Sequence, residues 1–518
     1  MIRAKDGQLI RRLLPSIGDF AFVLPILFLF GRMNGATTLL GDGDTGWHIR
    51  TGEWILANGR VPRQDIFSFT RPHQVWYAWE WLSDVIMGWL HQEGGMHAVL
   101  LGAIALLCAT FGLLYRLIRL KSGSVLIAFV LTAIAAGGSS IHWLARPHLF
   151  TMMFLIAFYS ILEERRMRLL FILPFATVIW TNLHGGFIAG IILICAYAGG
   201  ELIAALAATQ SDERCAARGR SWRYGLSALG CLAASLINPY TWHLHAQLVR
   251  FLTHPAYFQN VSEFVSINFR HPLAPFFEVM LMLGAATAFW SLTRRRFVPL
   301  VLLAGWAHLA LLSARNIPLF MLVAAPQLGI ALSEWMTHLQ EKTRGSTLHG
   351  VFCGFGLLST RLDAADAGVR WHVAGPAALL IAGAMMYGHT PSTRLQPRYD
   401  PGAYPTAALA VLHDSDRIFT SDTWGGYLIY RRYPAKVFLD GRADFYGPEF
   451  EAEYNDIMGV RSNWEARLAA YDVNTILLAV DTPLSGALKN SRGWRPVYDD
   501  GMAIVFRSTA GGTQTPND

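Results

Sequence analysis

The stretch GDGDTGWHIRTGEW, residues 41–54, decides how the rest of this chain is organised. It follows the first long apolar run and brings together two aspartates, a histidine, an arginine and two tryptophans. Side chains of this kind belong at a membrane surface and not in the bilayer core. Every later cluster of polar and aromatic residues falls, in the predicted topology, on the same side of the bilayer. We therefore interpret the apolar segments as a frame for residues 41–54.

The composition is that of a polytopic membrane protein. Of the 518 residues, 53% are hydrophobic and 15% are charged, with a mean hydropathy of +0.32, whereas a soluble protein carries about 25% charged residues. Apolar runs of about 17–25 residues, the length that spans a bilayer core, recur along the chain. The net charge of +7 does not indicate nucleic-acid binding, because the basic residues lie in short loops between apolar runs. None of the five cysteines forms a CxxC pair, so neither a disulfide framework nor a thiolate metal site is expected.

The basic loops give one consistent topology. Residues 1–16 are basic and are expected in the cytoplasm, and the first span, over 17–33, is expected to remain uncleaved. A large first outer loop, 34–95, follows, with surface helices expected over 47–56 and 79–90. We predict about eleven spans, the last over 372–387, with a cytoplasmic N-terminus and an outer C-terminus. Membrane lipid is thus an expected partner.

The composition changes near residue 388. Residues 1–390 are predicted to form the membrane domain, and 391–518 a small soluble extracytoplasmic α/β domain that begins with a Pro-rich linker and ends in a disordered tail. The fold class is therefore a polytopic α-helical membrane protein with a small C-terminal α/β domain. Strands are expected over 417–420, 436–439, 475–480, 495–498 and 502–506. Helices are expected over 404–412, 448–458 and 464–471.

Asp42 and Asp44 are the first candidates for chemistry. Two carboxylates separated by one residue can hold a divalent cation such as Mg²⁺ or Mn²⁺, or can supply a general base with a supporting charge. A solvated Asp–Gly turn is the alternative, because these residues favour turns for backbone reasons. His48 lies four residues after Asp44, about one helical turn along, and follows Trp47.

This stretch resembles the first outer loop of the GT-C superfamily. An acidic residue follows the first span, then come an aromatic residue and a short helix that ends in Gly and Pro. GT-C proteins are membrane glycosyltransferases that use polyprenyl-phosphate-linked sugars, and include protein O-mannosyltransferases, aminoarabinose transferases and oligosaccharyltransferases. Four further segments resemble a bacterial branch of the superfamily: ARPH (145–148), WTNLHGG (180–186), INPY (237–240) and ARN (314–316). The resemblance covers most of the membrane part.

The resemblance implies sugar transfer from a polyprenyl-phosphate donor to a saccharide, lipid or protein acceptor. The reaction would take place at the outer, periplasmic face of a bacterial inner membrane, with Asp44 as the catalytic base or as part of an acceptor or metal site. Superfamily members usually carry a second acidic residue beside the first, and Thr45 stands there in this chain. Arg146 and Arg315 lie at predicted outer span ends, where a guanidinium can bind the leaving phosphate in a fork. Snorkelling or pairing with a carboxylate is the alternative for both.

Further polar residues on the outer side are candidates for substrate binding. His48, His148 and His184 belong to a group of outer histidines, which are commonly structural when isolated. Glu80 and Asp84 lie one turn apart in the expected helix over 79–90 and could orient an acceptor. Two asparagines mark span ends, where helix capping is the alternative to a functional role: Asn182 and Asn316.

Two other functions remain open at this stage. A transporter or flippase for lipid-linked saccharides should carry ionisable residues near mid-membrane, whereas here the spans are poor in mid-membrane charge and polar residues collect at one face. An inactive scaffold derived from an enzyme is the other alternative. Residues 421–447 contain Asp440, Arg442 and Asp444, expected after a strand, with structural salt bridges favoured over chemistry. Gly425 and Gly426 indicate a close backbone approach.

Overall fold

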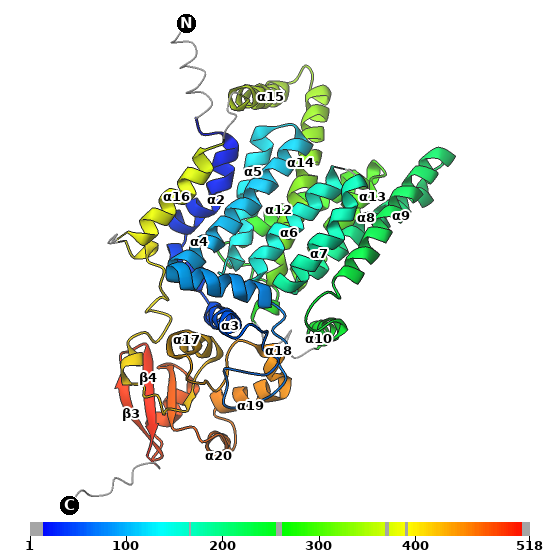
Figure 1. The fold of residues 1–518 in the computed structure, drawn as a ribbon. Helices are drawn as coiled ribbons and strands as arrows, with labels where there is room; N and C mark the ends of the chain where they lie inside the picture. Colours follow the sequence, from blue (N-terminus) through cyan, green and yellow to red (C-terminus); the bar gives the residue numbers. More distant parts are fainter. Residues whose placement is uncertain (1–13, 165–166, 255–261, 368–371, 389–391, 510–518) are drawn as a thin grey trace, which may run out of the picture.

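A helical bundle forms one end of the molecule and a small α/β unit forms the other, with short crosswise helices between them (Figure 1). The computed structural model describes residues 14–164, 167–254, 262–367, 372–388 and 392–509. The basic N-terminal residues up to 13 and the predicted disordered tail therefore lie outside the described residues.

Each predicted span coincides with a helix of the bundle. These helices are α2 (Ile17–Gly31), α4 (Trp81–Ser122), α5 (Val125–Ser139), α6 (His148–Glu163), α7 (Ile172–Leu183), α8 (Phe187–Ala207), α9 (Ser211–Ala234), α12 (Ala274–Thr293), α13 (Phe297–Leu312), α14 (Ile317–Lys342) and α16 (Ala374–Tyr387). By length and composition five apolar stretches of the described chain can cross a membrane, and five further apolar helices are shorter. The protein is a membrane protein, but the number of eleven crossings is not confirmed. Helix α9 belongs to neither group, because its first half is strongly charged.

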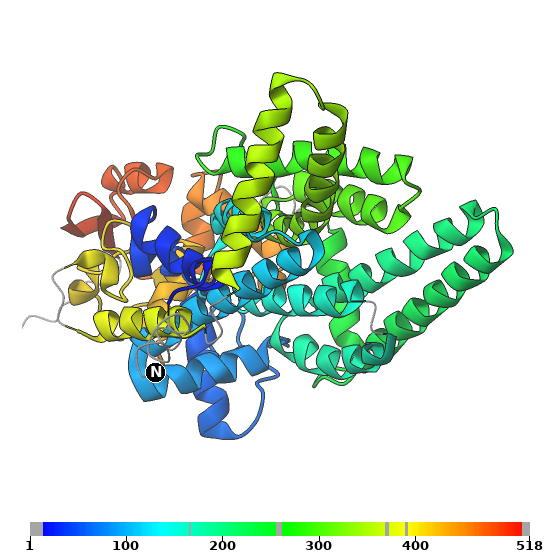
Figure 2. The same ribbon diagram turned by 90° about the horizontal axis from the view of Figure 1, so that it is seen from above.

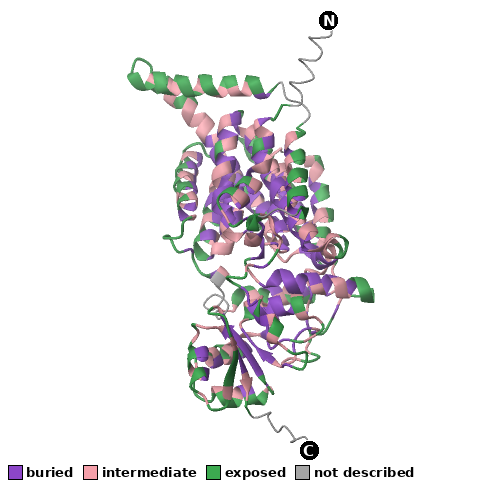
Figure 3. Ribbon diagram, turned by 90° about the vertical axis from the view of Figure 1, so that its left-hand side faces the viewer, coloured by how far each residue is buried: buried purple, intermediate pink, exposed green. Residues whose placement is uncertain are grey.

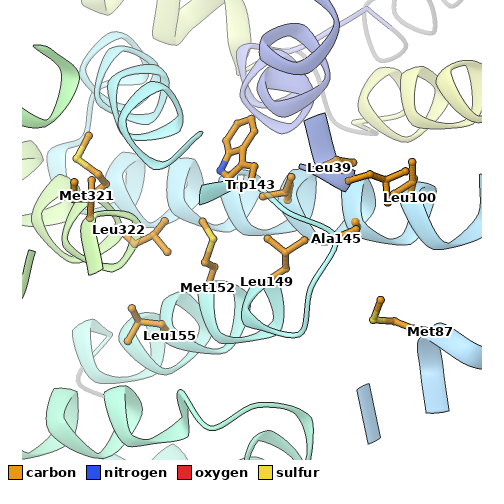
Figure 4. Close-up of a cluster of buried hydrophobic side chains, with 14 of the residues drawn as sticks. Leu39, Met87, Leu100, Trp143, Ala145, Leu149, Met152, Leu155, Met321 and Leu322 are labelled. Carbon is orange, nitrogen blue, oxygen red and sulfur yellow. The ribbon is translucent and has the colours of Figure 1, made fainter. Parts of the chain in front are cut away.

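The centre of the bundle is built from α4, α5, α6 and α14, which pack against one another. Trp143, Leu149, Met152 and Met321 fill this centre (Figure 4) and are at most 1% exposed. Large apolar side chains also point away from the bundle, as at Phe175, which is 70% exposed. An apolar exterior around a packed apolar interior is the arrangement expected where lipid surrounds the helices.

Helix α15 (Thr347–Asp366) crosses the end of the bundle remote from the α/β unit and is largely exposed (Figure 3). Asp366 ties it to the bundle by accepting a hydrogen bond from the Ile17 backbone N–H and pairing with Arg119 at 2.8 Å.

The first outer loop supplies the crosswise layer. It contains the 3-10 helix η1 (Gly35–Leu40) and α3 (Asp44–Asn58), which confirms the helix expected over 47–56. The helix expected over 79–90 is the first part of α4, which breaks at Gly95 and then continues into the bundle. Gly95 has φ +62°, a conformation that glycine adopts without strain. Helix α10 (Trp242–Thr253) lies in the same layer (Figure 1).

The C-terminal unit contains a four-stranded sheet in the order β1-β2-β4-β3. Strand β1 (Ile418–Phe419) pairs parallel with β2 (Thr475–Ala479), whereas β4 (Ala503–Ser508) pairs antiparallel with both β2 and β3 (Trp494–Asp499). Four of the five expected strands are confirmed in position. The helices are α17 (Asp422–Arg432), α18 (Ala443–Tyr446), α19 (Pro448–Met458), α20 (Trp464–Ala470) and α21 (Pro483–Lys489).

Two expectations for this unit are wrong. Residues 436–439 form no strand, because Val437 makes a single bridge to Ser68 of the outer loop instead of joining the sheet. Asp440, Arg442 and Asp444 therefore do not follow a strand. The helix expected over 404–412 is only the 3-10 turn η7 (Ala408–Val411).

The outer loop and the C-terminal unit meet through glycines. A Cβ atom on Gly43 would lie 2.0 Å from the Thr423 carbonyl oxygen, and one on Gly46 would lie 2.5 Å from the Gly426 carbonyl oxygen. These contacts set α3 directly against α17 and confirm the close approach expected at Gly426. A buried ion pair of 2.9 Å between Arg442 and Asp65 joins the two segments a second time.

Candidate active site

Four charged side chains meet where the bundle, the outer loop and the C-terminal unit come together. Arg146 lies 2.7 Å from Asp42 Oδ2, 2.8 Å from Asp44 Oδ2 and 2.8 Å from Glu263 Oε1. These side chains are only 12–23% exposed. The structure thus brings together three predicted site residues and adds one carboxylate that the sequence analysis did not single out. We call this group the carboxylate cluster.

The local backbone explains why these side chains converge. Asp44 opens α3, where the partial positive charge of a helix N-terminus favours a carboxylate, and its N–H donates to Asp42 Oδ1 at 3.1 Å. Arg146 lies in the loop just before α6. Two hydrogen bonds hold that loop, from Thr45 Oγ1 to the Ala145 carbonyl and from the Ala145 N–H to the Leu39 carbonyl. Thr45 therefore joins the start of α3 to the loop before α6.

The cluster contains carboxylates of very different acidity. Burial, together with the negative charges of Asp42 and Glu263, raises the pKa of Asp44 to about 7 against the opposing effect of Arg146. Burial also acts on Glu263, but Arg146 outweighs it there and lowers the pKa of Glu263 to about 2. A carboxyl group that titrates near neutral pH and is backed by ionised partners has the properties of a general base.

The C-terminal unit closes over Asp44. A Cβ atom on Gly441 would lie 2.1 Å from Asp44 Oδ1, so only glycine leaves this oxygen accessible at the normal backbone position. Buried hydrogen bonds between Arg442 and Asp440, of 2.7 Å each, hold the adjoining loop. Gly441 lies in residues 421–447, far from Asp44 in the sequence. Its role depends on this tertiary contact alone, so the sequence does not indicate it.

A second polar group lies beside the cluster. His48 Nδ1 is 2.6 Å from Asp84 Oδ1, and Glu80 lies 3.7 Å from His48 Nε2 and 3.3 Å from His184 Nε2. His184 Nδ1 is held by Thr151 Oγ1 at 2.8 Å. The structure brings four predicted site residues together here, and the Trp47 ring covers His48 with centroids 3.6 Å apart.

This second group is largely uncharged near neutral pH. Burial raises the pKa of Glu80 to about 8, so that its carboxyl group carries a proton. Burial lowers the pKa of His184 to about 3, and it also lowers the pKa of His48 well below its ordinary value. Neutral imidazoles and a protonated carboxyl group can orient a sugar hydroxyl by hydrogen bonding.

The remaining predicted residues have individual roles. Asn182 accepts from Trp81 Nε1 at 2.7 Å and donates to the Ile237 carbonyl, and Asn316 donates to the Leu309 carbonyl, which are contacts within the protein itself. His148 Nε2 is 2.9 Å from the His142 carbonyl oxygen. Arg315 lies with its guanidinium 4.6 Å above the Phe264 ring and has no carboxylate partner among the residues described.

The predicted metal site would share its carboxylates with Arg146. The guanidinium contacts one oxygen of each aspartate, Asp42 Oδ2 at 2.7 Å and Asp44 Oδ2 at 2.8 Å, so a Mg²⁺ or Mn²⁺ ion would have to bind through the other oxygens or displace Arg146. Within the described part of the chain, no three His, Cys, Asp or Glu residues are grouped as a metal ion requires. The donor set instead fits a fixed organic cation, which Arg146 supplies.

Two cavities lie in this part of the molecule. One of about 210 Å³ is lined by apolar residues of α4 and α6 and by Arg146, so it reaches the carboxylate cluster. The other, of about 320 Å³, lies between the outer loop, α10 and the C-terminal unit. Its lining is aromatic and polar and includes Trp76, Tyr77, Phe445 and Asp444.

Solved structures share this architecture. The archaeal oligosaccharyltransferase AglB from Archaeoglobus fulgidus, in complex with an inhibitory peptide and a dolichol-phosphate, matches with a TM-score of 0.51 and 13% identity over 96% of this chain and 74% of AglB. The fold of this chain is thus similar to that of AglB. The oligosaccharyltransferase of Archaeoglobus fulgidus in complex with Zn and sulfate matches with a TM-score of 0.50 and 12% identity over 95% of this chain and 73% of that protein.

A third structure, ArnT from Cupriavidus metallidurans bound to undecaprenyl phosphate, has a TM-score of 0.44 and 15% identity over 95% of this chain and 97% of ArnT. No protein-family model and no curated protein sequence matches the chain. At these identities the likeness to the two oligosaccharyltransferase structures concerns the fold alone.

Proposed function

We propose that the protein is a membrane glycosyltransferase that moves a sugar from a polyprenyl-phosphate donor to an acceptor at the outer face of the cytoplasmic membrane. The observation that carries this proposal is the carboxylate cluster at the inner end of an apolar cavity. There Asp44 has a pKa raised to about 7 by burial, while Arg146 adjoins the cavity lining. A lipid-linked donor needs an apolar path that ends beside the base, and Arg146, which lines this cavity, holds Asp44 there.

The proposed chemistry needs a base, which is Asp44, and a cation for the phosphate, which is Arg315. Asp44 takes the proton from the acceptor hydroxyl as the oxygen forms a bond to the anomeric carbon. The bond from that carbon to the phosphate oxygen breaks, and its electron pair stays on the lipid phosphate. Arg146 is already surrounded by three carboxylates. Arg315 feels the charges of Glu263 and Glu80 but forms no ion pair within 4.0 Å among the described residues, so its guanidinium can bind the leaving phosphate.

The acceptor approaches from the opposite side. Aromatic rings and hydrogen-bonding groups together favour a sugar or another polar acceptor in the cavity between the outer loop and the C-terminal unit. The contacts of Glu80 with His48 and His184 place neutral donors and acceptors beside the cluster. The carboxylate cluster and these neutral groups all lie at the end of the bundle that faces the C-terminal unit. Their position favours chemistry at the membrane surface over transport through the bundle.

The test is release of free polyprenyl phosphate by the protein in lipid vesicles that contain lipid-linked sugars and candidate acceptors. The parent should release it, and Arg315→Gln should lower the rate by about 10²-fold, as loss of a charged stabilising group typically does. Arg344→Gln, an exposed arginine beyond α14, is the matched control and should match the parent. A protein that moves the intact lipid-linked sugar across the bilayer without releasing lipid phosphate would support the transporter instead.

A further inference from the structure

A third cavity lies at the end of the bundle remote from the carboxylate cluster, and the proposed transfer does not use it. It encloses about 350 Å³ between α6, α8, α9, α12, α13 and α14. Figure 2 looks onto this end of the molecule, where α8 and α9 extend together beyond the other helices. Its lining combines charged residues with apolar ones such as Phe297, Val298 and Ile330.

The acids in this cavity are already neutralised. Three carboxylates line it, and each forms an ion pair with its own cation: Glu163 with Lys121 at 2.5 Å, Glu201 with Arg220 at 2.8 Å, and Glu334 with Arg296 at 2.5 Å. Glu163 is bound further by the hydroxyl of Tyr197 and by Gln327 Nε2 at 2.9 Å. Because every acid is paired, an additional cation gives the cavity a net positive charge.

That additional cation is Arg295. Its side chain lines the cavity and has no ion-pair partner among the residues described. Its backbone has φ +53°, which an L-residue adopts at a cost in energy. The turn therefore holds an arginine in a conformation that glycine would adopt more readily.

Two further hydrogen-bond donors in the cavity lack partners. Arg220 Nε and Thr287 Oγ1 are buried without a hydrogen bond, and Thr287 is 1% exposed. A buried donor without an acceptor is costly, so such groups mark places where a ligand or water belongs. Arg295, Arg220 and Thr287 all offer protons, and the partner they lack is an acceptor with negative charge.

We propose that this cavity binds a phosphate-ester anion, with Arg295 as its charge partner and Arg220 Nε and Thr287 Oγ1 as hydrogen-bond donors. The apolar wall formed by Phe297, Val298 and Ile330 fits the chains of a phospholipid better than a soluble ester. This site is independent of the proposed sugar transfer.

Retention of lipid by the purified full chain tests the proposal. The protein would be titrated with phosphatidylglycerol or phosphatidylcholine, and bound lipid counted by native mass spectrometry. The parent should retain phosphatidylglycerol in preference, and Arg295→Gln should weaken that binding about tenfold, the effect of losing one charge-assisted hydrogen bond. Arg344→Gln removes an exposed arginine outside the cavity and should bind like the parent.

Two additional arms identify the source of the anion and guard against misfolding. Thr287→Val keeps the side-chain shape and the net charge, so a loss of phosphatidylglycerol binding at an unchanged melting temperature would support the site. Displacement of the lipid by millimolar inorganic phosphate would assign the same site to soluble phosphate esters. Equal binding of both lipids, unchanged in Arg295→Gln and Thr287→Val and insensitive to phosphate, would overturn the proposal.

Discussion

At the scale of single residues, the site depends on one arginine that organises three carboxylates. Arg146 binds Asp42, Asp44 and Glu263 through oxygens 2.7–2.8 Å away. The sequence predicted that the aspartates and the arginine lie on one side of the membrane, because spacing and loop charge are local properties. It could not predict that Glu263 joins them, since that contact depends on how a distant outer loop folds back.

Gly441 provides a sharp residue-scale prediction. Gly441→Ala would place a Cβ atom 2.1 Å from Asp44 Oδ1, and Asp44 cannot move freely because Arg146 holds its other oxygen. We expect sugar transfer to fall by at least about tenfold, because misplacement of about 1 Å can cost more than that. Gly486→Ala, in the same unit with no atom near the new Cβ, should leave the rate unchanged. Equal rates in both variants would show that Gly441 does not limit the site.

The raised pKa values predict a bell-shaped pH profile. Asp44 must be ionised to accept a proton, so the rate should rise with pH through its pKa of about 7, which burial raises. Glu80 should be protonated, so the rate should fall as pH passes its pKa of about 8. Glu80→Gln mimics the protonated form, and we expect it to keep the acidic limb and lose the alkaline one. An alkaline limb that persists in Glu80→Gln belongs to another group.

The arginine also predicts how the protein responds to chelators. Arg146 contacts Oδ2 of both Asp42 and Asp44, and already supplies a positive charge between the two carboxylates. Turnover in excess EDTA should therefore stay within about twofold of the untreated rate. Loss of turnover that Mg²⁺ or Mn²⁺ restores would show that the ion displaces the guanidinium during catalysis.

At the scale of elements, α3 is positioned by its glycines. A Cβ on Gly52 would lie 1.7 Å from the Asp84 carbonyl oxygen, just as Gly46 faces α17, so α3 packs closely against both α4 and α17. Gly46→Ala should therefore lower stability by about 1–3 kcal/mol, the usual cost of overpacking. Gly219→Ala in exposed α9 has open space around it and should instead raise stability by up to about 1 kcal/mol. Thermal unfolding in detergent compares the two, and shifts of the same sign would contradict this packing.

The membrane-spanning helices were predictable because the surrounding lipid requires long apolar runs in the sequence. The spans stand out in the sequence because an apolar exterior and an apolar interior together make long hydrophobic runs. Residues 436–439 have the composition of a strand, yet Val437 pairs with Ser68 of the outer loop. Such pairing joins segments far apart in sequence, which local propensity does not describe.

At the scale of the whole molecule, the α/β unit and α15 lie at opposite ends of the bundle (Figure 1). The predicted topology places α15 in the cytoplasm and the α/β unit outside. In sealed right-side-out vesicles, an impermeant maleimide should label Ser491→Cys at once, whereas exposed Cys215 and Cys353 should react only after permeabilisation. Labelling of Cys353 in sealed vesicles would reverse the orientation, and would also move the reaction to the inner face.

The central claim is that Asp44 is the base for transfer from a lipid-linked donor. The most direct measurement compares Asp44→Asn with the parent for release of polyprenyl phosphate, with donor binding measured on the same preparations. We predict that donor binding persists while turnover falls by about 10²–10⁴-fold, the usual contribution of a general base. Turnover equal to that of the parent, at unchanged donor binding, would contradict the assignment of Asp44 and transfer the search to Asp42 or Glu80.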